Sequence, residues 1–168
     1  MTKIEFKALR MFRSVELMRN METEHLHKLA SLAREVRFLE GEIIYCRGNI
    51  GKAIYLIEEG QVTKETDVPG QDPVTLNILG PGQFFGWSSL FPSERKMFLT
   101  RAVKPTRAIA IDANRLRAAW QRDYYLEYAI IRRAGKDIVN RIKAARQQLA
   151  DMLASPISNN YPTKSYRG

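Results

Sequence analysis

Residues 80–103, GPGQFFGWSSLFPSERKMFLTRAV, are the stretch around which the rest of this chain is interpreted. Three glycines, an aromatic pair, two adjacent serines and a basic pair lie within one short span. Glycine permits positive φ values and close backbone approach, and residues 87–90 are suited to open a helical turn. A helix start with free amide donors, followed closely by Arg95 and Lys96, is a candidate anion site. The alternative is a glycine-bounded turn between two strands, with a solvated basic loop.

The segments on both sides of this stretch have the period-two alternation of β-strands. Before it, runs of alternating apolar residues begin at Glu35, and glycines or prolines separate each run from the next. After it, residues 97–103 and 107–111 supply two further strands around a turn at Lys104 and Pro105. Short strands at such regular intervals are typical of a β-sandwich or jelly roll. The sequence therefore predicts a mainly β fold.

Helical patterns flank the predicted strands at both ends of the chain. Residues 4–20 predict a short helix or helix-turn, and Thr23 begins a second helix whose apolar residues recur at helical spacing as far as Ala33. On the other side, Asp112 caps a short helix and Asp123 caps a much longer one. We therefore expect a β-domain with flanking helices, the last of which leaves the domain.

An apolar seam runs along this long helix. Its members are separated by four and three residues in turn, which is the a/d spacing of a coiled coil. They are Ile131, Gly135, Ile138, Ile142, Ala145, Leu149 and Met152. A seam this regular predicts parallel pairing with a second copy of the chain. The alternative is that the seam packs back on the chain's own β-domain.

The length and composition fit one domain with an extension. The chain has 168 residues, of which 45% are hydrophobic, and this is enough for one well-packed core. No apolar run reaches the length of a membrane span, so we expect a soluble, cytoplasmic protein without membrane contact. The single cysteine, Cys46, excludes an intrachain disulfide, and we expect it to be free and buried. His25 and His27 alone supply few metal ligands, so no metal is expected.

The net charge of +9 is unevenly distributed along the chain. Residues 1–100 hold 13 Lys and Arg against 13 Asp and Glu, whereas residues 101–168 hold 14 against 5. The whole basic excess therefore lies in the C-terminal part. This asymmetry indicates either attraction to nucleic acid or to an acidic protein, or only a solvated basic helix face.

A specific pattern of glycines and apolar residues runs through the predicted strands. It consists of Gly41, Glu42, Ile44, Gly48, Gly51, Tyr55, Ile57, Gly60 and Val62, followed by Leu-Gly-Pro-Gly-Gln-Phe-Phe-Gly at 79–86. This pattern resembles the cyclic nucleotide-binding domain family, over about residues 24 to 150 of the chain. The resemblance implies a β jelly roll with N-terminal helices and a long C-terminal helix that pairs two protomers and closes over the ligand. It is closest to stand-alone members whose Phe-Gly is followed by Trp-Ser.

The resemblance also implies that residues 80–103 contain the family's phosphate-binding cassette. In that family, backbone amides at a short helix start hold the cyclic phosphate. A Glu after the Phe-Gly pair accepts a hydrogen bond from the ribose hydroxyl, and a nearby Arg pairs with the phosphate. The ligand-binding candidates of this chain are then Phe85, Gly86, Trp87, Ser88, Ser89, Arg95 and Lys96.

The chain departs from the family pattern at three places in this pocket. Trp87 stands where the ribose-binding Glu is expected, and the Arg position falls on Lys96 or, one residue out of register, on Arg95. The purine-contacting hydroxyls fall near Ala145 and Arg146. If each lost contact costs about 1 to 3 kcal/mol, a micromolar site weakens into the millimolar range or beyond. Trp87 either plugs the emptied pocket or stacks on a planar ligand, while the serines and cassette amides remain to hold an anion.

These observations divide the chain into four parts. We expect a helical lead-in at 1–22, a cyclic-nucleotide-binding-like jelly roll at 23–122, a dimerisation helix at 123–154 and a flexible tail at 155–168. No Ser-His-Asp set, activated cysteine or paired carboxylate motif stands out, so we expect no enzymatic activity and no cofactor. The last residues are too few for a winged helix-turn-helix, so no sequence-specific DNA binding is expected.

Three functions are open at this point. The first is a sensor in which a cyclic nucleotide or another small anion enters the cassette and repositions the long helix of a homodimer, a change that a partner protein reads. The second is a ligand-independent dimeric interaction module, in which Trp87 fills the pocket and the basic helix binds an acidic partner. The third is nucleic-acid binding without sequence specificity. The sequence identifies neither the ligand, the partner nor the process, and it assigns no role to Cys46.

Overall fold

The computed structural model describes residues 1–154, and the tail predicted to be flexible, 155–168, lies outside the described residues. The chain divides into two compact units, Met1–Arg133 and the part that begins at Ala134. The helical elements of the first unit are α1 (Lys3–Ser14), the 3₁₀ turn η1 (Glu16–Met18), α2 (Thr23–Ser31), the 3₁₀ turn η2 (Trp87–Leu90) and α3 (Ala113–Trp120). Helix α4 (Tyr124–Ala154) begins in the first unit and continues into the second.

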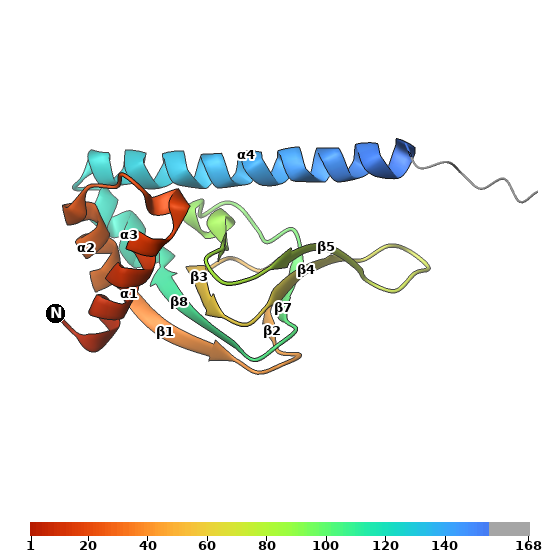
Figure 1. Cartoon of the computed structure of the whole chain (residues 1–168), viewed down its shortest axis with the longest axis horizontal. Coiled ribbons are helices and arrows are strands. Elements are labelled where there is room, and N and C mark those ends of the chain that lie inside the picture. The colour runs from red at the N-terminus through yellow and green to blue at the C-terminus, as the bar shows by residue number, and fades with distance from the viewer. Residues whose placement is uncertain (155–168) are drawn as a thin grey trace, which may run out of the picture. The chain divides into compact units, whose positions relative to one another are not determined.

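Two antiparallel four-stranded sheets form the β-domain (Figure 1). The first sheet has the order β1-β8-β3-β6 and the second the order β2-β7-β4-β5, so most neighbouring strands are distant in the sequence. The strands are β1 (Ala33–Phe38), β2 (Ile43–Tyr45), β3 (Ala53–Glu59), β4 (Val62–Thr66), β5 (Val74–Leu79), β6 (Phe84–Phe85), β7 (Leu99–Ala102) and β8 (Thr106–Asp112). The prediction of a mainly β jelly roll with flanking helices is confirmed.

The core of the β-domain forms where the two sheets meet. Ile57 of β3 and Phe85 of β6 pack with Val62 of β4 and Leu79 of β5, and each of these side chains is at most 3% exposed. Strands β3 and β8 are the central strands of their sheet, are buried over most of their length and contact α3. Strands buried on both faces lose the polar positions that strict alternation requires.

The second N-terminal helix, α2, ends two residues earlier than its apolar pattern predicts. Helix α2 ends at Ser31, and Ala33 is the first residue of β1, where it pairs with Ile111 of β8. The predicted helical spacing through Ala33 is therefore wrong at its end. An alanine fits a helix face and a strand equally well, and pairing with β8 decided the outcome.

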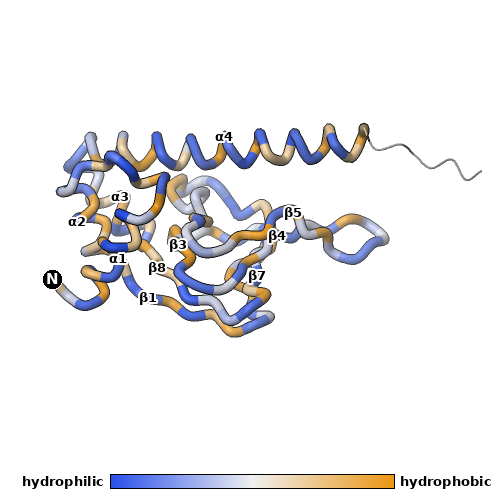
Figure 2. Tube along the Cα trace, in the orientation of Figure 1, coloured by the Kyte–Doolittle hydropathy of each residue, from blue (hydrophilic) through white to orange (hydrophobic). Residues whose placement is uncertain are grey.

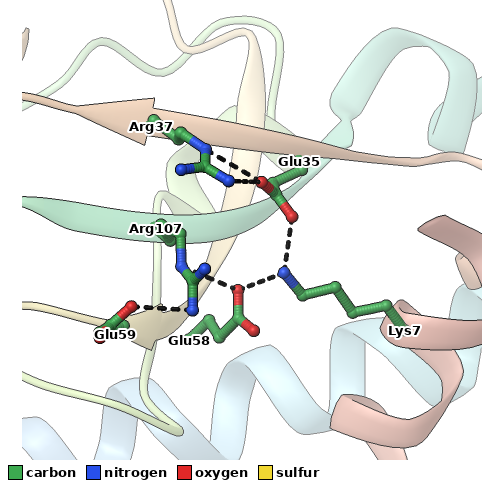
Figure 3. A network of polar contacts seen from close by, with 6 residues as sticks. All are labelled: Lys7, Glu35, Arg37, Glu58, Glu59 and Arg107. Atoms are coloured by element: carbon green, nitrogen blue, oxygen red, sulfur yellow. Dashed lines mark hydrogen bonds and ion pairs between the residues drawn. The ribbon is translucent and has the colours of Figure 1, made fainter. Parts of the chain in front are cut away.

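A network of charged side chains joins α1 to the outer face of the first sheet (Figure 3). The Lys7 Nζ atom lies 2.6 Å from Glu35 of β1 and 2.5 Å from Glu58 of β3. Burial lowers the pKa of Lys7, but hydrogen bonds to Glu35 and Glu58 outweigh this effect and raise the pKa above its ordinary value. The hydrogen bond from Lys7, reinforced by Arg37, lowers the pKa of the Glu35 carboxyl. The network therefore favours the charged form of both partners.

Helix α4 begins as predicted, with Asp123 as its cap. The Asp123 Oδ1 atom accepts a hydrogen bond of 3.0 Å from the backbone amide of Leu126. Leu126 and Ile130 are buried, whereas Tyr124 and Tyr128 on the neighbouring stripe are exposed. Hydrophilic and hydrophobic residues alternate along the helix (Figure 2). No helix within residues 1–154 is both long enough and apolar enough to cross a membrane.

Candidate functional site

The cassette turn, which we define as Phe85–Leu90, begins at the end of β6 and includes η2. Gly86 adopts a φ of 92°, and a Cβ atom there would lie 2.7 Å from the carbonyl oxygen of Ala53. Only glycine fits this combination of positive φ and close approach. Phe85 is fully buried and stacks on Tyr55, with ring centroids 4.7 Å apart. The turn is therefore anchored to β3 on the side of the core.

Lys96 inserts its ammonium group into the cassette turn. Its Nζ atom donates hydrogen bonds of 2.9 Å to the Ser88 Oγ atom, 2.9 Å to the Ser89 Oγ atom and 3.2 Å to the Gly86 carbonyl. It also lies 4.6 Å from the centroid of the Tyr45 ring, in a cation–π contact. Lys96 is only 4% exposed. The cation that the sequence placed near the cassette is thus enclosed by it.

The electrostatic surroundings of Lys96 are unusual for a buried lysine. None of the carboxylates in residues 1–154 forms an ion pair with its Nζ atom. Burial, assisted by the positive charge of Lys64, lowers the pKa of Lys96 to about 8. Removing an ammonium from water disfavours its charged form unless an anion compensates. The site therefore holds a cation whose charge no carboxylate of the described residues balances through an ion pair.

A cavity of about 310 Å³ opens beside Lys96. Its lining combines two aromatic rings, two lysines, an amide side chain and small or aliphatic residues, namely Ile44, Tyr45, Asn49, Ile50, Gly51, Lys52, Ala53, Tyr55 and Lys96. Burial raises the pKa of the Tyr55 hydroxyl, although the charge of Arg34 opposes this effect. The cavity thus has an apolar and aromatic wall with one buried cation at its side, which is a suitable arrangement for a small anionic ligand.

The structure settles which basic residue reaches the cassette. Arg95 is exposed and donates a hydrogen bond of 3.0 Å to the carbonyl of Gly48. Lys96, in contrast, contacts the turn directly. The two candidates face different surroundings because consecutive residues of an extended segment point in opposite directions.

Trp87 is buried in the structure but does not line the described cavity. Only 5% of it is exposed, and its ring stacks on Phe84 with centroids 5.2 Å apart. The indole is absent from the set of described residues that line the cavity beside Lys96. Its burial indicates a packing role.

Several lining residues were not singled out as site residues in the sequence. Tyr45, Gly51, Lys52 and Tyr55 lie on β2, on β3 or in the loop between them. A signal was present, because the two tyrosines belong to the predicted strands on either side of the glycine-containing segment 48–51. Their meeting beside residue 96 depends on strand pairing across the jelly roll, which local pattern does not specify.

Cys46 differs from its expectation. It is free, but it is exposed rather than buried. Strand β2 ends at Tyr45, and Cys46 starts the following turn, where its backbone amide donates a 2.7 Å hydrogen bond to Asn49. The apolar run that predicted a strand position ends at Tyr45. Cys46 therefore lies just outside β2, and its thiol is exposed.

The predicted helix seam is divided between the two compact units. Ile131 belongs to the first unit, and the remaining members belong to the second, as do Ala145 and Arg146. Ile142, Leu149 and Met152 are 61%, 57% and 73% exposed in the single chain. The seam is therefore an apolar stripe on a polar helix, which is the form expected of a helix that pairs with another.

Comparison with known proteins identifies relatives in several bacteria. The cyclic AMP receptor protein of Thermus thermophilus is 35% identical over 95 residues, which are 56% of this chain and 38% of the relative. A CRP-like cAMP-activated global transcriptional regulator of Mycobacterium tuberculosis is 23% identical over 141 residues, 84% of this chain and 61% of the relative. The chain thus spans less than two thirds of the length of these curated relatives.

Solved structures and family models agree with the jelly-roll architecture. A cyclic nucleotide-binding domain from Methylobacillus flagellatus superposes with a TM-score of 0.77 at 17% identity, covering 92% of this chain and 87% of that one. This likeness concerns the fold. The model of the cyclic nucleotide-binding domain matches residues 35–123, which are more than half of the chain. The chain therefore belongs to the cyclic nucleotide-binding domain family.

Proposed function

We propose that this chain is a non-enzymatic sensor module that binds a small anion beside Lys96 and transmits its presence through α4. The observation that carries the proposal is the buried, uncompensated ammonium of Lys96 at the side of a 310 Å³ cavity. An anion in this cavity would supply the negative charge that residues 1–154 do not provide at Lys96. Charge compensation in a partly desolvated site is a strong source of affinity.

The lining of the cavity supports a ligand with a planar part and one negative charge. Tyr45 and Tyr55 offer ring surfaces, and Asn49 offers an amide that both donates and accepts. The volume is close to the lower limit for small-molecule sites. Cyclic AMP is the first ligand to test, because two relatives carry it in their names. The loss of the ribose-binding Glu at Trp87 supports weak binding of cyclic nucleotides or preference for another small anion.

A physical connection from the cassette toward α4 supports the sensor proposal. Arg117 of α3 donates a hydrogen bond to the carbonyl of Ser89 in the cassette turn. Helix α3 ends at Trp120, and α4 begins only a few residues later, at Tyr124. A ligand that draws Lys96 away from the two serines would alter the turn that Arg117 holds. The exposed apolar seam of α4 supports a homodimer as the element that carries the change to a partner protein.

Thermal unfolding with and without ligand tests the proposal. Cyclic AMP, cyclic GMP, AMP, GMP and inorganic phosphate are each added at millimolar concentrations to the wild-type chain and to Lys96→Met. A ligand at ten times its dissociation constant contributes about 1.4 kcal/mol, which raises the Tm by about 3 to 6 °C. We expect at least one of these anions to raise the Tm of the wild type and none to raise that of Lys96→Met.

Lys104→Met is the matched control, because it removes the same charge at an exposed turn residue. It should retain the ligand response. Equal responses in all three proteins would mean that the anion binds elsewhere. Absence of any response in the wild type would overturn the sensor proposal.

A ligand-independent interaction module is the second candidate. It is favoured by the hydrogen bonds of Lys96, because three acceptors already occupy its ammonium, and by the burial of Trp87 against Phe84. In this case the basic residues of α4 bind an acidic protein, and they are Arg132, Arg133, Lys136, Arg141, Lys143 and Arg146. Capture of a polyglutamate peptide at low salt, with no response to any nucleotide, would favour this candidate. Salt-sensitive binding of random-sequence duplex DNA would instead favour the nucleic-acid function.

A further inference from the structure

The amine of Lys96 has the properties of a covalent capture site. It is buried, it lines a cavity, and no carboxylate of residues 1–154 forms an ion pair with it. We propose that Lys96 reacts reversibly with carbon dioxide to form a carbamate. This inference goes beyond the proposed sensor function, because the modification requires no nucleotide and is detected independently of one.

The reaction balances without any oxidant, reductant or cofactor. The lone pair of the neutral Nζ atom attacks the carbon of carbon dioxide, and a new N–C bond forms. One C=O π bond opens onto its oxygen, and a proton leaves the nitrogen for water. The products are an N-carboxylate on Lys96 and one released proton. Loss of the carboxylate by the reverse path makes the modification responsive to carbon dioxide.

The surroundings of Lys96 favour the neutral amine that this reaction needs. The charged and titratable groups near the amine come from several elements: Tyr45 of β2, Lys52, Tyr55 of β3, Lys64 of β4 and Arg95. Burial disfavours the ammonium form, and the positive charge of Lys64 adds to this effect. With a pKa of about 8, half of Lys96 is neutral at pH 8. An exposed lysine is neutral in less than about 1% of molecules at that pH. The neutral fraction of Lys96 is therefore larger by a factor on the order of 100.

The same surroundings stabilise the product. A carbamate places a negative charge where the ammonium placed a positive one. The interaction of residue 96 with nearby cations such as Lys64 then becomes attractive instead of repulsive. The Ser88 Oγ atom accepts a hydrogen bond from Lys96, and no acceptor for its own proton is found within residues 1–154. This hydroxyl is therefore available to donate to the new carboxylate, whereas Ser89 already donates to the Ala53 carbonyl. The anion is placed beside the cassette turn.

The packing on the Gly51 side of the amine favours a small electrophile. A Cβ atom on Gly51 would lie 2.1 Å from the Ser89 Oγ atom and 2.8 Å from the Lys96 Nζ atom, so the amine is tightly enclosed on that side. Lys96 also lines the described cavity, which gives a small molecule access to it. Carbon dioxide is linear, uncharged and small, and it reaches the amine without displacing Tyr45 from its contact with the ammonium.

The test equilibrates the full chain with ¹³C-labelled carbon dioxide at a fixed partial pressure and pH 8. Carbamates are recorded by ¹³C NMR and then trapped by alkylation with triethyloxonium for peptide mass spectrometry. We expect a trapped carbamate on the peptide that contains Lys96. Its occupancy should rise with pH between 7 and 8.5 at constant carbon dioxide, since both neutralisation of the amine and proton release favour the product.

Three variants give this experiment its specificity. Lys96→Arg retains the charge but cannot supply a neutral amine near pH 8, so the signal should disappear. Lys104→Arg changes an exposed lysine that does not line the described cavity, and should leave the signal unchanged. Ser88→Ala keeps the amine and removes the donor, and should lower the occupancy severalfold. A thermal unfolding curve for each variant confirms that it is folded.

The proposal is overturned if the wild type yields no carbamate at Lys96, or if occupancy at Lys96 does not exceed that at exposed lysines. A signal that persists in Lys96→Arg would assign it to another amine and would equally overturn the proposal. Neither result bears on nucleotide binding, which the thermal shift measures separately.

Discussion

The Nζ atom of Lys96 lies 2.9 Å from the Oγ atom of Ser89, and both atoms occupy the space that a side chain on Gly51 would need. Three segments distant in the sequence therefore meet at one point. They are the loop before β3, which contains Gly51, the cassette turn, and the segment before β7, which contains Lys96. The Ser89 hydroxyl is fixed further by donating to the Ala53 carbonyl. This contact holds the cassette turn in place without any ligand.

We predict that Gly51→Ala destabilises the protein. Its Cβ atom would lie 2.1 Å from the Ser89 Oγ atom and 2.7 Å from the Lys96 Cε atom, so a buried hydrogen-bonded pair has to move. Overpacking of this kind costs about 1 to 3 kcal/mol. Urea unfolding measures the loss. Gly80→Ala is the control, because a Cβ atom there meets no atom within 4 Å, and it should change stability by less than about 0.5 kcal/mol. Equal effects of the two substitutions would contradict this account of the packing.

The stability of the protein should depend on pH through Lys96. Its pKa is about 8 in the folded chain and near 10.5 in the unfolded one, so between these values the unfolded chain binds more protons. The contribution of this group to the free energy of unfolding therefore rises as pH increases from 8 to 10.5, by up to about 3 kcal/mol. Below pH 8 both states are charged, and the slope vanishes.

The measurement compares urea unfolding of the wild type and Lys96→Met at several pH values, which cancels the titration of shared groups such as tyrosines. We expect the difference between their unfolding free energies to change in favour of the wild type across this window. Parallel curves for the two proteins would show that Lys96 has an ordinary pKa in the folded state.

The helix seam predicts self-association that a single charge disrupts. Ile142 is 61% exposed in the single chain and stands at an a/d position, so Ile142→Glu would bury a carboxylate in the paired state. Even a cost of about 1.4 kcal/mol weakens association tenfold, and we expect at least this much. Sedimentation velocity gives the dissociation constant. Ala144→Glu adds the same charge off the seam and should associate like the wild type. A wild type that sediments as a monomer would contradict the predicted self-association.

The network at Lys7 predicts a stability loss that depends on pH. Lys7→Met leaves Glu35 and Glu58 without the cation that α1 supplies, at a position about one fifth exposed. The pKa of Glu35 is lowered in the folded chain, so its contribution is present above the ordinary carboxyl pKa and is lost as pH falls through the folded value. Lys7→Met should therefore cost about 1 kcal/mol at pH 7 and much less near pH 3, measured by urea unfolding. Lys3→Met, on the exposed side of the same helix, should have no comparable effect at either pH.

Part of the site was predictable because its signals are local. The positive φ at Gly86 and the helical turn at 87–90 follow from residues that are neighbours in the chain. The choice between Arg95 and Lys96 was not predictable in this way, since both are cations and the decision depends on which side of the segment faces the core. For the same reason the sequence left open whether Trp87 fills a pocket or contacts a ligand, and its stacking on Phe84 is a property of the folded chain.

The sequence by itself determined the jelly-roll class, the flanking helices and the caps at Asp112 and Asp123, because alternation, glycine spacing and capping act over a few residues. Only the tertiary structure decided where β1 begins, that Cys46 is exposed, and that Lys96 is enclosed by Ser88 and Ser89 with Tyr45 above its ammonium. These features arise from contacts between segments brought together by pairing across two sheets. The burial that lowers the pKa of Lys96 exists only once that pairing has formed.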